Sequence, residues 1–531
     1  MDSEKHLPKS NHREMKKTIK IIVFTLVILS VLILVVLSIK FSPVYVYRLI
    51  TQNVADVYDY QLYENRTIKG ADSTFQFKEN QNEKYVEDLF QDRMLRSGFK
   101  TFDEWAEKSQ TTALIFIRKD TILYEKYFNG FSRDSYFHSQ SMAKSFISFM
   151  IGAAIDDGLI SGVDDPMTKY IPELKERNTR FENITIKNLL EMRSGLAYNT
   201  SYLPGTNIHA PWHDEAIGYY HPNVRKLLLE KVEIAGEPGG NFQYCNYNTS
   251  YLGLLIERGT GKTVSKYLEE KLWSQIMEYD ALFSIDSKES GFEYMPSRLI
   301  ARAIDYARFG RLYLKEGDWN GKQIISKDWI KKSTKEDKSI PRNIYPEWLG
   351  GDNCNHTYYS YQWWGNAECD SSYQFFANGN LGQNIYVIPD KEIIIVHCGN
   401  SLEFYNEGDL WHVADCIRFN DFHQLIVNKG VTEAIREYHE KKKQYPNYQP
   451  FDERFLKDIG YAYLDGGKTE DAKKIFALNI ESYPDSWQVY NNMAEAYAKS
   501  GDADSAIMLY QKSLTMKPEN NWATEKLKML E

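Results

Sequence analysis

Residues 21–39 form an uninterrupted run of 19 uncharged residues, in which only Thr25, Ser30 and Ser38 are polar. As a helix rising about 1.5 Å per residue, this run spans roughly 28 Å, close to the hydrocarbon thickness of a bilayer. Six Lys and Arg residues and three acidic residues precede it. The positive-inside rule therefore predicts a cytoplasmic segment over 1–20, a transmembrane helix over 21–39 and export of the remaining chain.

A cleaved signal peptide is the alternative for this segment. The apolar run is longer than a usual signal core, which has about 7–15 residues, and no small-x-small cleavage site follows it. The run ends in Ser38-Ile39-Lys40-Phe41, without the Cys that lipoprotein processing needs. These features favour an uncleaved single-span anchor, with the bulk of the protein on the extracytoplasmic side of the membrane.

Charge and cysteine content exclude some classes of function. Lys and Arg number 64 against 73 Asp and Glu, a net charge of −9, which argues against nucleic acid as a partner. Five Cys in 531 residues are too few for a disulfide framework. Cys354 and Cys369 flank an aromatic stretch and are either bridged or free, because export makes a disulfide feasible. We expect Cys245, Cys398 and Cys416 to be buried thiols.

The order of strand-like and helix-like segments predicts an α+β domain over 85–420. Residues 40–84 are polar and are expected to be a linker with a short structured lead-in. Two β-type runs at 113–118 and 122–128 precede a series of helical segments, and further β-type runs come late in the chain at 373–377, 385–388 and 393–397. Strands, helices and strands again indicate that the first and last strands share one antiparallel sheet.

The C-terminal region, 421–531, has an internal repeat of 34 residues. Tyr463, Gly467, Ala472 and Pro484 are each matched 34 positions later, by Tyr497, Gly501, Ala506 and Pro518. A looser copy at Gly430, Ala434, Tyr438 and Pro446 precedes them. The period is that of tetratricopeptide repeats, so we expect three helix-turn-helix units and a capping helix over 521–530, stacked as an α-solenoid that binds a protein partner. The small Gly and Ala are expected where paired helices approach closely, and an unrelated helical bundle is the alternative.

Ser141 and Lys144 are the first candidates for chemistry. They stand three residues apart at the start of an apolar helix, so both side chains lie on one helix face. A Lys with a lowered pKa can take the proton of a Ser hydroxyl, and the helix N-terminus can stabilise an oxyanion. A capped helix with a solvated Lys is the bland alternative, but this helix is apolar on nearly all sides.

Tyr244 and Asn246 form the second candidate group, after the turn at Pro238-Gly239-Gly240. A Tyr near a Lys can share a proton with it, and an Asn can orient the Lys and a substrate carbonyl. Alone, Tyr244 would be one structural ring among 38 Tyr residues. Tyr244 is therefore a candidate catalytic residue only in combination with Ser141 and Lys144.

Taken together, these segments resemble the serine β-lactamase-related hydrolases over about 85–420. The resemblance is carried by five signatures in order: 141–144 followed by 164–166 and 171–174; 184–196; 238–246 followed by 252–257; 305–312; and 361–364. Within that group, which includes class C β-lactamases and penicillin-binding peptidases, the chain looks most similar to the 6-aminohexanoate-dimer hydrolase-like branch. The resemblance implies a β-lactamase/penicillin-binding-protein-like fold, an antiparallel sheet flanked by helices with an additional all-helical region.

The resemblance also implies roles for particular residues. Ser141 corresponds to the acylated nucleophile, Lys144 to its activator and Tyr244 to the proton-transferring partner, while Asn246 corresponds to a less constant side chain. The family's third motif falls on 377–379, where Gly379 is kept and the usual cation is replaced by Ala377. Gly379 would let substrate lie against the strand, and the N–H of Asn380 would join that of Ser141 in an oxyanion hole.

The missing cation favours a neutral amide or ester, from a small molecule or a peptide, over a β-lactam or a peptide carboxylate. His209 and His213 would suit a metal only on one helix, and Pro211 between them predicts a loop, so we expect neither a metal nor another cofactor. The sequence thus predicts a membrane-anchored serine hydrolase with partner-binding repeats. The alternative is a catalytically weak hydrolase-fold scaffold that acts through its repeats.

Overall fold

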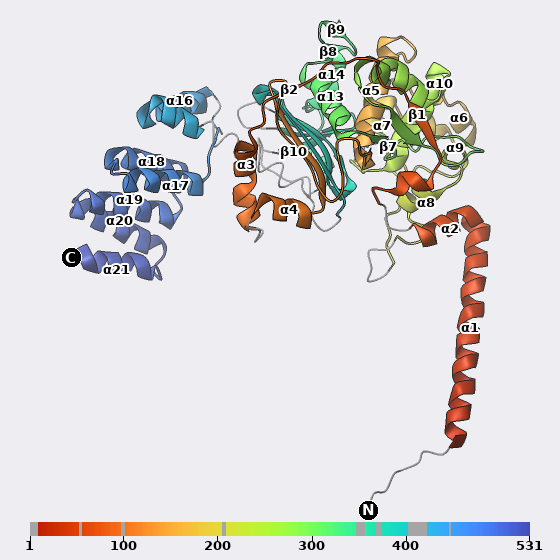
Figure 1. Ribbon diagram of the computed structural model, residues 1–531, viewed down its shortest axis with the longest axis horizontal. Helices are drawn as coiled ribbons and strands as arrows, with labels where there is room; N and C mark the ends of the chain where they lie inside the picture. Colours follow the sequence, from red (N-terminus) through yellow and green to blue (C-terminus); the bar gives the residue numbers. More distant parts are fainter. Residues whose placement is uncertain are drawn as a thin grey trace, which may run out of the picture.

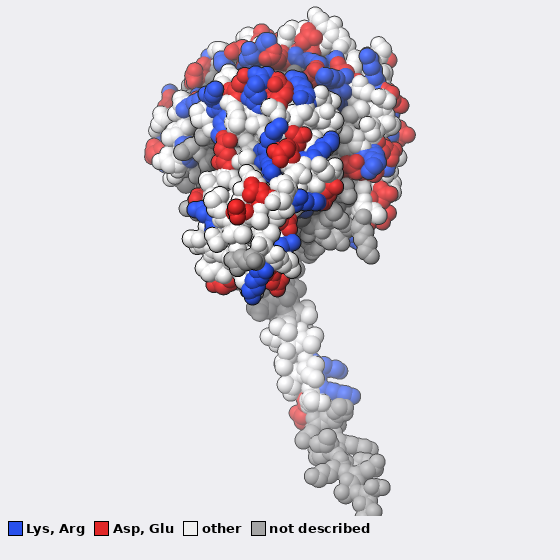
Figure 2. Space-filling view, turned by 90° about the vertical axis from the view of Figure 1, so that its left-hand side faces the viewer, with Lys and Arg blue, Asp and Glu red and all other residues white. Residues whose placement is uncertain are grey.

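The computed structural model describes residues 9–52, 56–96, 101–203, 209–346, 356–367, 373–401, 422–444, 446 and 448–530, with no side chains described for 9–13 and 90–96. Helix α1 (Lys9–Phe41) projects from the body as a single rod (Figure 1). Its segment Glu14–Phe41 is the one helix among the described residues that is long and apolar enough to cross a membrane, a test that a signal sequence also passes. Figure 2 shows a long uncharged stretch of this rod below the body, followed by basic residues.

An eight-stranded sheet forms the centre of the α+β domain, in the order β10-β11-β12-β13-β14-β3-β4-β2. The hairpin β3–β4 lies early in the chain, and the late strand β14 pairs antiparallel with β3, which confirms that the first and last strands share one sheet. Among the described strands of this sheet, only the short β2 pairs parallel with its neighbour, β4. The strands are β2 (Lys78–Glu79), β3 (Thr111–Arg118), β4 (Thr121–Tyr127), β10 (His356–Ser360), β11 (Trp363–Ala367), β12 (Tyr373–Gly379), β13 (Gln383–Ile388) and β14 (Ile393–Gly399).

Helices cover both faces of this sheet (Figure 1). Strand β3 is apolar on both sides: Ile115 and Ile117 face the main core, which includes α5 (Ala143–Asp156), α10 (Asn246–Thr260) and α13 (Ala303–Leu314). Leu114 and Phe116 face the opposite cluster, beneath α3 (Glu83–Arg96) and α4 (Phe102–Lys108). The alternation follows from the two-residue period of a strand, and it places α5 in the layer next to the sheet.

A smaller four-stranded sheet, in the order β1-β6-β7-β5, leads into the candidate site. Its strand β5 ends three residues before Ser141, so the sheet fixes where the following turn starts. Its strands are β1 (Asn65–Ile68), β5 (Phe137–His138), β6 (Ala281–Ser284) and β7 (Leu299–Ala301). The accompanying helical region contains α6 (Glu173–Arg177), α7 (Ile186–Leu190), α8 (Asp214–Tyr220), α9 (Val224–Glu230), α11 (Val264–Leu268) and α12 (Ser274–Ile276). A hairpin of β8 (Asp318–Trp319) and β9 (Lys322–Gln323) precedes α14 (Lys327–Thr334).

Residues 40–84 are not a tether, contrary to the expectation from their polar composition. Helix α2 (Pro43–Thr51) buries Tyr45, Val46 and Leu49 in the main core. Further along, β1 pairs with β6 and β2 with β4, so the segment adds one strand to each of the two sheets. The buried face of α2 consists of only three residues. Such a short pattern in the sequence does not show that the helix belongs to the core.

The repeats form consecutive antiparallel helices, beginning with a helix at 422–429. They continue through α16 (Val431–Gln444), α17 (Glu453–Asp465), α18 (Thr469–Ser482), α19 (Trp487–Lys499), α20 (Ala503–Met516) and α21 (Asn521–Leu530). Pro446, Pro484 and Pro518 each follow the second helix of a pair, where the missing N–H cannot break a helical hydrogen bond. Neighbouring helices share their buried clusters, as expected of a solenoid.

The glycines of the 34-residue period have a different reason from the one expected. Gly430, Gly467 and Gly501 have φ of 85°, 75° and 83°, and a Cβ at any of them would meet no atom within 4 Å. They are needed for left-handed turn backbone, not for close helix packing. The close approach lies instead at Gly460, where a Cβ would clash with the Phe476 ring, and at the buried Ala472.

Two of the five cysteines, Cys245 and Cys398, are free and buried, as the sequence predicts. Burial raises the pKa of the Cys245 thiol to about 12, so it stays protonated. Cys354, Cys369 and Cys416 lie outside the described residues. The predictions made for those three thiols therefore stay predictions.

Among the residues that the structure describes, the buried clusters of the repeats contain only residues from 422–530 and share none with the core of the α+β domain. We therefore expect a chain ending at residue 421 to keep the melting transition that this domain shows in the full chain. Differential scanning calorimetry measures that transition, and labelling of Ser141 by a fluorophosphonate probe checks the site. A truncated chain that is folded but cannot be labelled would contradict the separation.

Candidate active site

Ser141 stands in the short turn η2 (Gln140–Met142) that joins β5 to α5. Gln140 has a φ of 44°, an unusual left-handed conformation for a residue with a side chain, and its N–H donates to His138 Nδ1 at 3.2 Å. Met142 N–H donates to Ser139 O at 3.1 Å, which closes the turn. The strained backbone presents the half-buried Ser141 side chain at the N-terminal end of α5, where it lines a pocket.

Lys144 lies in the first turn of α5 and is 1 % exposed. Its Nζ is 2.8 Å from Ser141 Oγ and donates to Pro296 O at 3.0 Å. Burial lowers the pKa of the Lys144 amine to about 7, although the charge of Glu215 acts to raise it. Near neutral pH, a large fraction of this amine is therefore uncharged and can accept the Ser141 proton.

Tyr244 precedes α10 and brings its ring to the same amine. The distance from Lys144 Nζ to the Tyr244 ring centroid is 4.9 Å. The ring stacks on Trp364 of β11, with 5.6 Å between centroids, and meets Tyr359 of β10 edge-on. Strands far along the chain thus hold Tyr244 in place, and the sequence-predicted set of Ser141, Lys144 and Tyr244 comes together.

Asn246 is the first residue of α10 and lines the pocket that contains Ser141. Its Oδ1 is buried and has no hydrogen-bond partner within the described part of the chain. A buried acceptor without a partner costs about 1–3 kcal/mol. The atom is therefore suited to accept a hydrogen bond from a bound molecule, which agrees with the position predicted for Asn246.

Gly379 ends β12 and lies against the backbone of the Ser141 turn. A Cβ on Gly379 would stand 2.6 Å from Ser139 O and 2.8 Å from Ser141 N, distances that no real side chain adopts. The glycine is thus required by backbone packing, in addition to any role in leaving room for substrate. Asn380 follows it at the pocket, and Ala377 is buried on the same strand.

The pocket is lined by residues that the sequence pattern did not single out together with the expected ones. Helix α8 contributes four of the lining residues, more than any other helix or strand. The described lining of the pocket contains neither Lys nor Arg. The lining consists of Gln140, Ser141, His209, Glu215, Ala216, Tyr219, Tyr220, Asn246, Ser297 and Asn380. Spacing alone could not reveal α8 as a pocket wall, because α8 and Ser141 are far apart in the sequence and only the fold brings them to one pocket.

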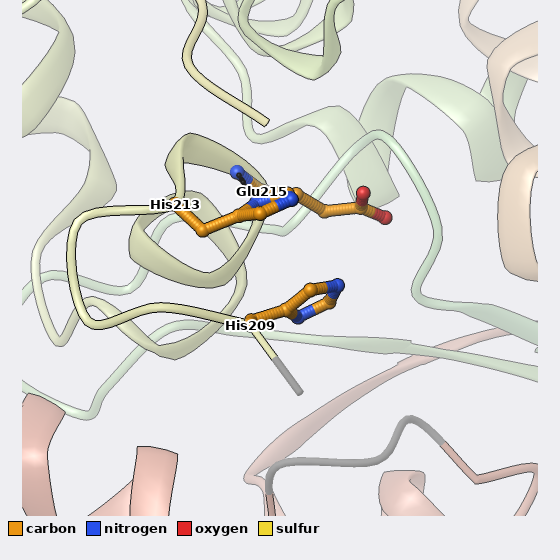
Figure 3. A group of neighbouring side chains, drawn as sticks. All are labelled: His209, His213 and Glu215. Carbon is orange, nitrogen blue, oxygen red and sulfur yellow. Dashed lines mark hydrogen bonds between the residues drawn. The ribbon is translucent and has the colours of Figure 1, made fainter. Parts of the chain in front are cut away.

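His209, His213 and Glu215 form a cluster at this pocket (Figure 3). Pro211 keeps the two histidines off a common helix, as predicted, but their candidate ligand atoms and those of Glu215 still lie within 4.8 Å of one another. The two rings are 4.2 Å apart between centroids. Burial, together with His209, lowers the pKa of His213 to about 4, so the ring is neutral.

The surroundings of the two rings do not fit a zinc site. A zinc-bound His normally donates its other N–H to an acceptor. His213 Nδ1 instead accepts the N–H of Glu215, at 3.2 Å, which leaves the ring proton on Nε2. His209 Nδ1 is buried without a partner among the described residues. The hydrogen bonds of the two rings therefore do not support a metal site, and His209 and Glu215 are part of the pocket wall.

Comparison with known proteins identifies the fold and the family. The family model described as beta-lactamase matches residues 90–415. The chain belongs to the beta-lactamase family. A tetratricopeptide repeat model matches residues 488–520, in agreement with the repeats described above.

Individual relatives agree with this assignment. The 6-aminohexanoate-dimer hydrolase of Paenarthrobacter ureafaciens is 28% identical over 319 residues, which cover 57% of this chain and 76% of the relative. Protein flp of Staphylococcus aureus strain N315 is 30% identical over 130 residues, 24% of each chain. The solved structure of a putative 6-aminohexanoate-dimer hydrolase from Bacillus anthracis has a TM-score of 0.54 at 23% identity, covering 69% of this chain and 94% of its own, and shows the shared fold.

Family and fold make this beta-lactamase-family protein a serine hydrolase, as the sequence predicts. The expectation of a β-lactamase-like α+β fold with helical repeats is confirmed as well.

Gly379→Ala tests the packing of β12 against the Ser141 turn. Because two backbone atoms would have to move, we expect a loss of about 1–3 kcal/mol in the free energy of unfolding. The rate of fluorophosphonate labelling should fall at the same time, since Ser141 N moves with the turn. Gly162→Ala is the matched control, because its Cβ would meet no atom within 4 Å. Wild-type labelling and stability in Gly379→Ala would contradict the close approach.

Proposed function

We propose that this serine hydrolase cleaves an amide or ester through an acyl-enzyme on Ser141. The observation that carries the proposal is the 2.8 Å separation between Ser141 Oγ and the buried Lys144 Nζ. An amine with a pKa of about 7 is a competent general base near neutral pH, whereas a solvated Lys is not.

In the acylation step, Ser141 Oγ attacks the substrate carbonyl carbon while its proton passes to Lys144 Nζ. The N–H groups of Ser141 and Asn380 hold the resulting oxyanion. When the tetrahedral intermediate collapses, the bond to the leaving group breaks, and that group takes the proton back from Lys144 or through the Tyr244 hydroxyl. A water then attacks the ester on Ser141 with the same bases, which releases the acid and restores the hydroxyl.

A neutral acyl group fits this pocket best. Ala377 occupies the position where the family motif usually has a cation, and no described lining residue is Lys or Arg. A substrate carboxylate would meet the carboxylate of Glu215 without a counter-charge. Asn246 Oδ1 can accept the N–H of an amide substrate, because this buried oxygen has no partner among the described residues.

The N-terminal helix and the C-terminal repeats support two further proposals, on the location of the enzyme and on its binding partner. We propose that α1 anchors the enzyme in a membrane, with residues 1–20 in the cytoplasm and the hydrolase on the extracytoplasmic side, because the helix is uncharged over 21–39 and basic before it. The repeats over 421–531 are proposed to bind a protein partner, as helical solenoids commonly do.

Substitution at Ser141, Lys144 and Tyr244 tests the assignment. Ser141→Ala should abolish hydrolysis of p-nitrophenyl acetate, and Lys144→Ala should cost nearly as much, because groups that act as a unit give non-additive losses. Tyr244→Phe should lower kcat about 10²–10⁴-fold, the usual contribution of a general acid or base.

Tyr170→Phe is the matched control, because its hydroxyl donates to Asp165, a residue outside the pocket lining. This variant should leave kcat within a factor of two. Mass spectrometry of the trapped enzyme locates the adduct. An adduct on a residue other than Ser141, or full turnover by Ser141→Ala, would defeat the proposal and favour a scaffold that works through its repeats.

The pH profile tests Lys144 as the base. Below a pKa of about 7 the amine is protonated and cannot accept the Ser141 proton, so the acylation rate should rise with pH through about 7 and level off above it. Stopped-flow measurement of the acylation burst gives this rate between pH 5.5 and 9. Lys144→Arg should lose the rise together with most of the rate, because a guanidinium stays charged over this range. A profile that is flat from pH 6 to 8 in the wild type would contradict the assignment.

A further inference from the structure

Helix α2 has two apolar faces, and only one of them is covered by the protein. Tyr45, Val46 and Leu49 are buried in the hydrolase core. Val44, Tyr47 and Ile50, spaced three residues apart on the other side, are 45%, 66% and 61% exposed. A short helix that is apolar on its outer face is unfavourable in water and needs an apolar neighbour.

A second exposed apolar element lies beside α2. Tyr202 and Trp212, in the segment before α8, are 49% and 47% exposed. The Tyr45 hydroxyl donates to Pro211 O at 2.7 Å, so α2 and this segment are in direct contact. We call Val44, Tyr47, Ile50, Tyr202 and Trp212 the apolar collar.

Exposed apolar side chains of the hydrolase are concentrated in this region. Among the described residues of 43–401, eight large hydrophobic side chains are exposed. Seven of them fall within 44–62 and 202–212, and the eighth is Leu159. Scattered exposure is normal for a soluble domain, but five of these eight side chains belong to the apolar collar, on α2 and the segment in contact with it, and this concentration marks a contact surface.

The chain connection says which surface the collar meets. The apolar run of α1 ends at Ile39 and α2 begins at Pro43, so only three residues, each at most about 3.5 Å long, separate them. Leu37 and Phe41 also pack against the hydrolase core, which leaves no slack in the connection. If α1 crosses a bilayer, α2 therefore lies in its headgroup region, where helices with an apolar face and exposed Tyr and Trp rings are favoured.

The same helix α2 is one helix away from the pocket. Arg48 Nη1 donates to Tyr220 O at 3.2 Å, and the Tyr220 hydroxyl donates to Gln52 O. These contacts pack α2 on α8, whose residues Glu215 and Tyr219 line the pocket of Ser141. Figure 1 shows α8 next to α2 at the point where α1 leaves the body. Tyr202 of the collar also packs on His209 of the pocket lining, with 5.3 Å between their ring centroids.

We infer that the apolar collar seats the hydrolase on the surface of the bilayer that α1 crosses, with the Ser141 pocket beside that surface. The substrate is then an amphiphilic amide or ester, whose apolar part stays in the bilayer while its acyl carbonyl reaches Ser141. This inference rests on the proposed anchor and acyl-enzyme.

Two esters of different location test the inference in the full-length enzyme, reconstituted in phosphatidylcholine nanodiscs. The collar variant combines Val44→Ser, Tyr47→Ser and Ile50→Ser, three exposed positions that leave α1 and the pocket lining intact. We expect this variant to hydrolyse the water-soluble p-nitrophenyl acetate at the wild-type rate. Its turnover of a long-chain p-nitrophenyl ester dissolved in the bilayer should fall about tenfold, which corresponds to about 1.4 kcal/mol of lost binding to the membrane surface. Leu159→Ser, the exposed control, should change neither rate.

The outcomes separate the collar from the proposals on which it rests. Equal losses on both esters, or no loss on either, would overturn the collar. A wild-type enzyme inactive on both esters would defeat the acyl-enzyme proposal instead, and loss of the protein from the nanodisc would defeat the anchor.

A photocrosslinker provides a readout that needs no activity. Benzoylphenylalanine at position 47 should form adducts with phospholipid acyl chains that mass spectrometry detects, and the same group at position 159 should not. Absence of a lipid adduct at position 47, in protein that remains in the nanodisc, would overturn the collar.

Discussion

A lysine ammonium that is buried away from water is stable only if it pairs with an anion, and otherwise its pKa falls. Burial lowers the pKa of Lys144 to about 7, so the amine loses its proton near neutral pH. Its surroundings offer a carbonyl, a hydroxyl and a ring face: Pro296 O, Ser141 Oγ and Tyr244. The negative charge of Glu215 acts against the shift without reversing it. The reactivity proposed for Ser141 depends on this balance, since a protonated Lys144 could not take the hydroxyl proton.

Several elements of the fold pack around the Lys144 amine and exclude water from it. Helix α5 is buried along nearly its whole length between the sheet and α10, so its first turn is buried too. Strand β12 comes so close to the Ser141 turn that only a glycine fits at 379. The aromatic residues of β10 and β11 then hold the Tyr244 ring over the amine from the other side. Three separate parts of the chain therefore contribute to one protonation state.

The N-terminal lead-in connects this site to the proposed membrane anchor. Because α2 is buried on one face and packs on α8, the helix that follows α1 is also a support for the pocket wall. The repeats, by contrast, have buried clusters of their own, and none of their described residues belongs to the hydrolase core. The two ends of the chain thus relate differently to the site: the N-terminal end is built into it, and the C-terminal end is an added module.

Features that depend on neighbours along the chain could be predicted from the sequence. The length and basic flank of 21–39, the 34-residue period and the Ser141–Lys144 spacing are local patterns with few structural solutions. The sheet shared by early and late strands also followed, because β-runs at both ends of an α+β domain must pair somewhere. Only the tertiary structure decided that α2 is core and not tether, that α8 walls the pocket with Glu215, and that Gly379 touches the Ser141 turn. The physical reason is that burial, close approach and a shifted pKa are produced by residues distant in the chain, and no local pattern records which of them will meet.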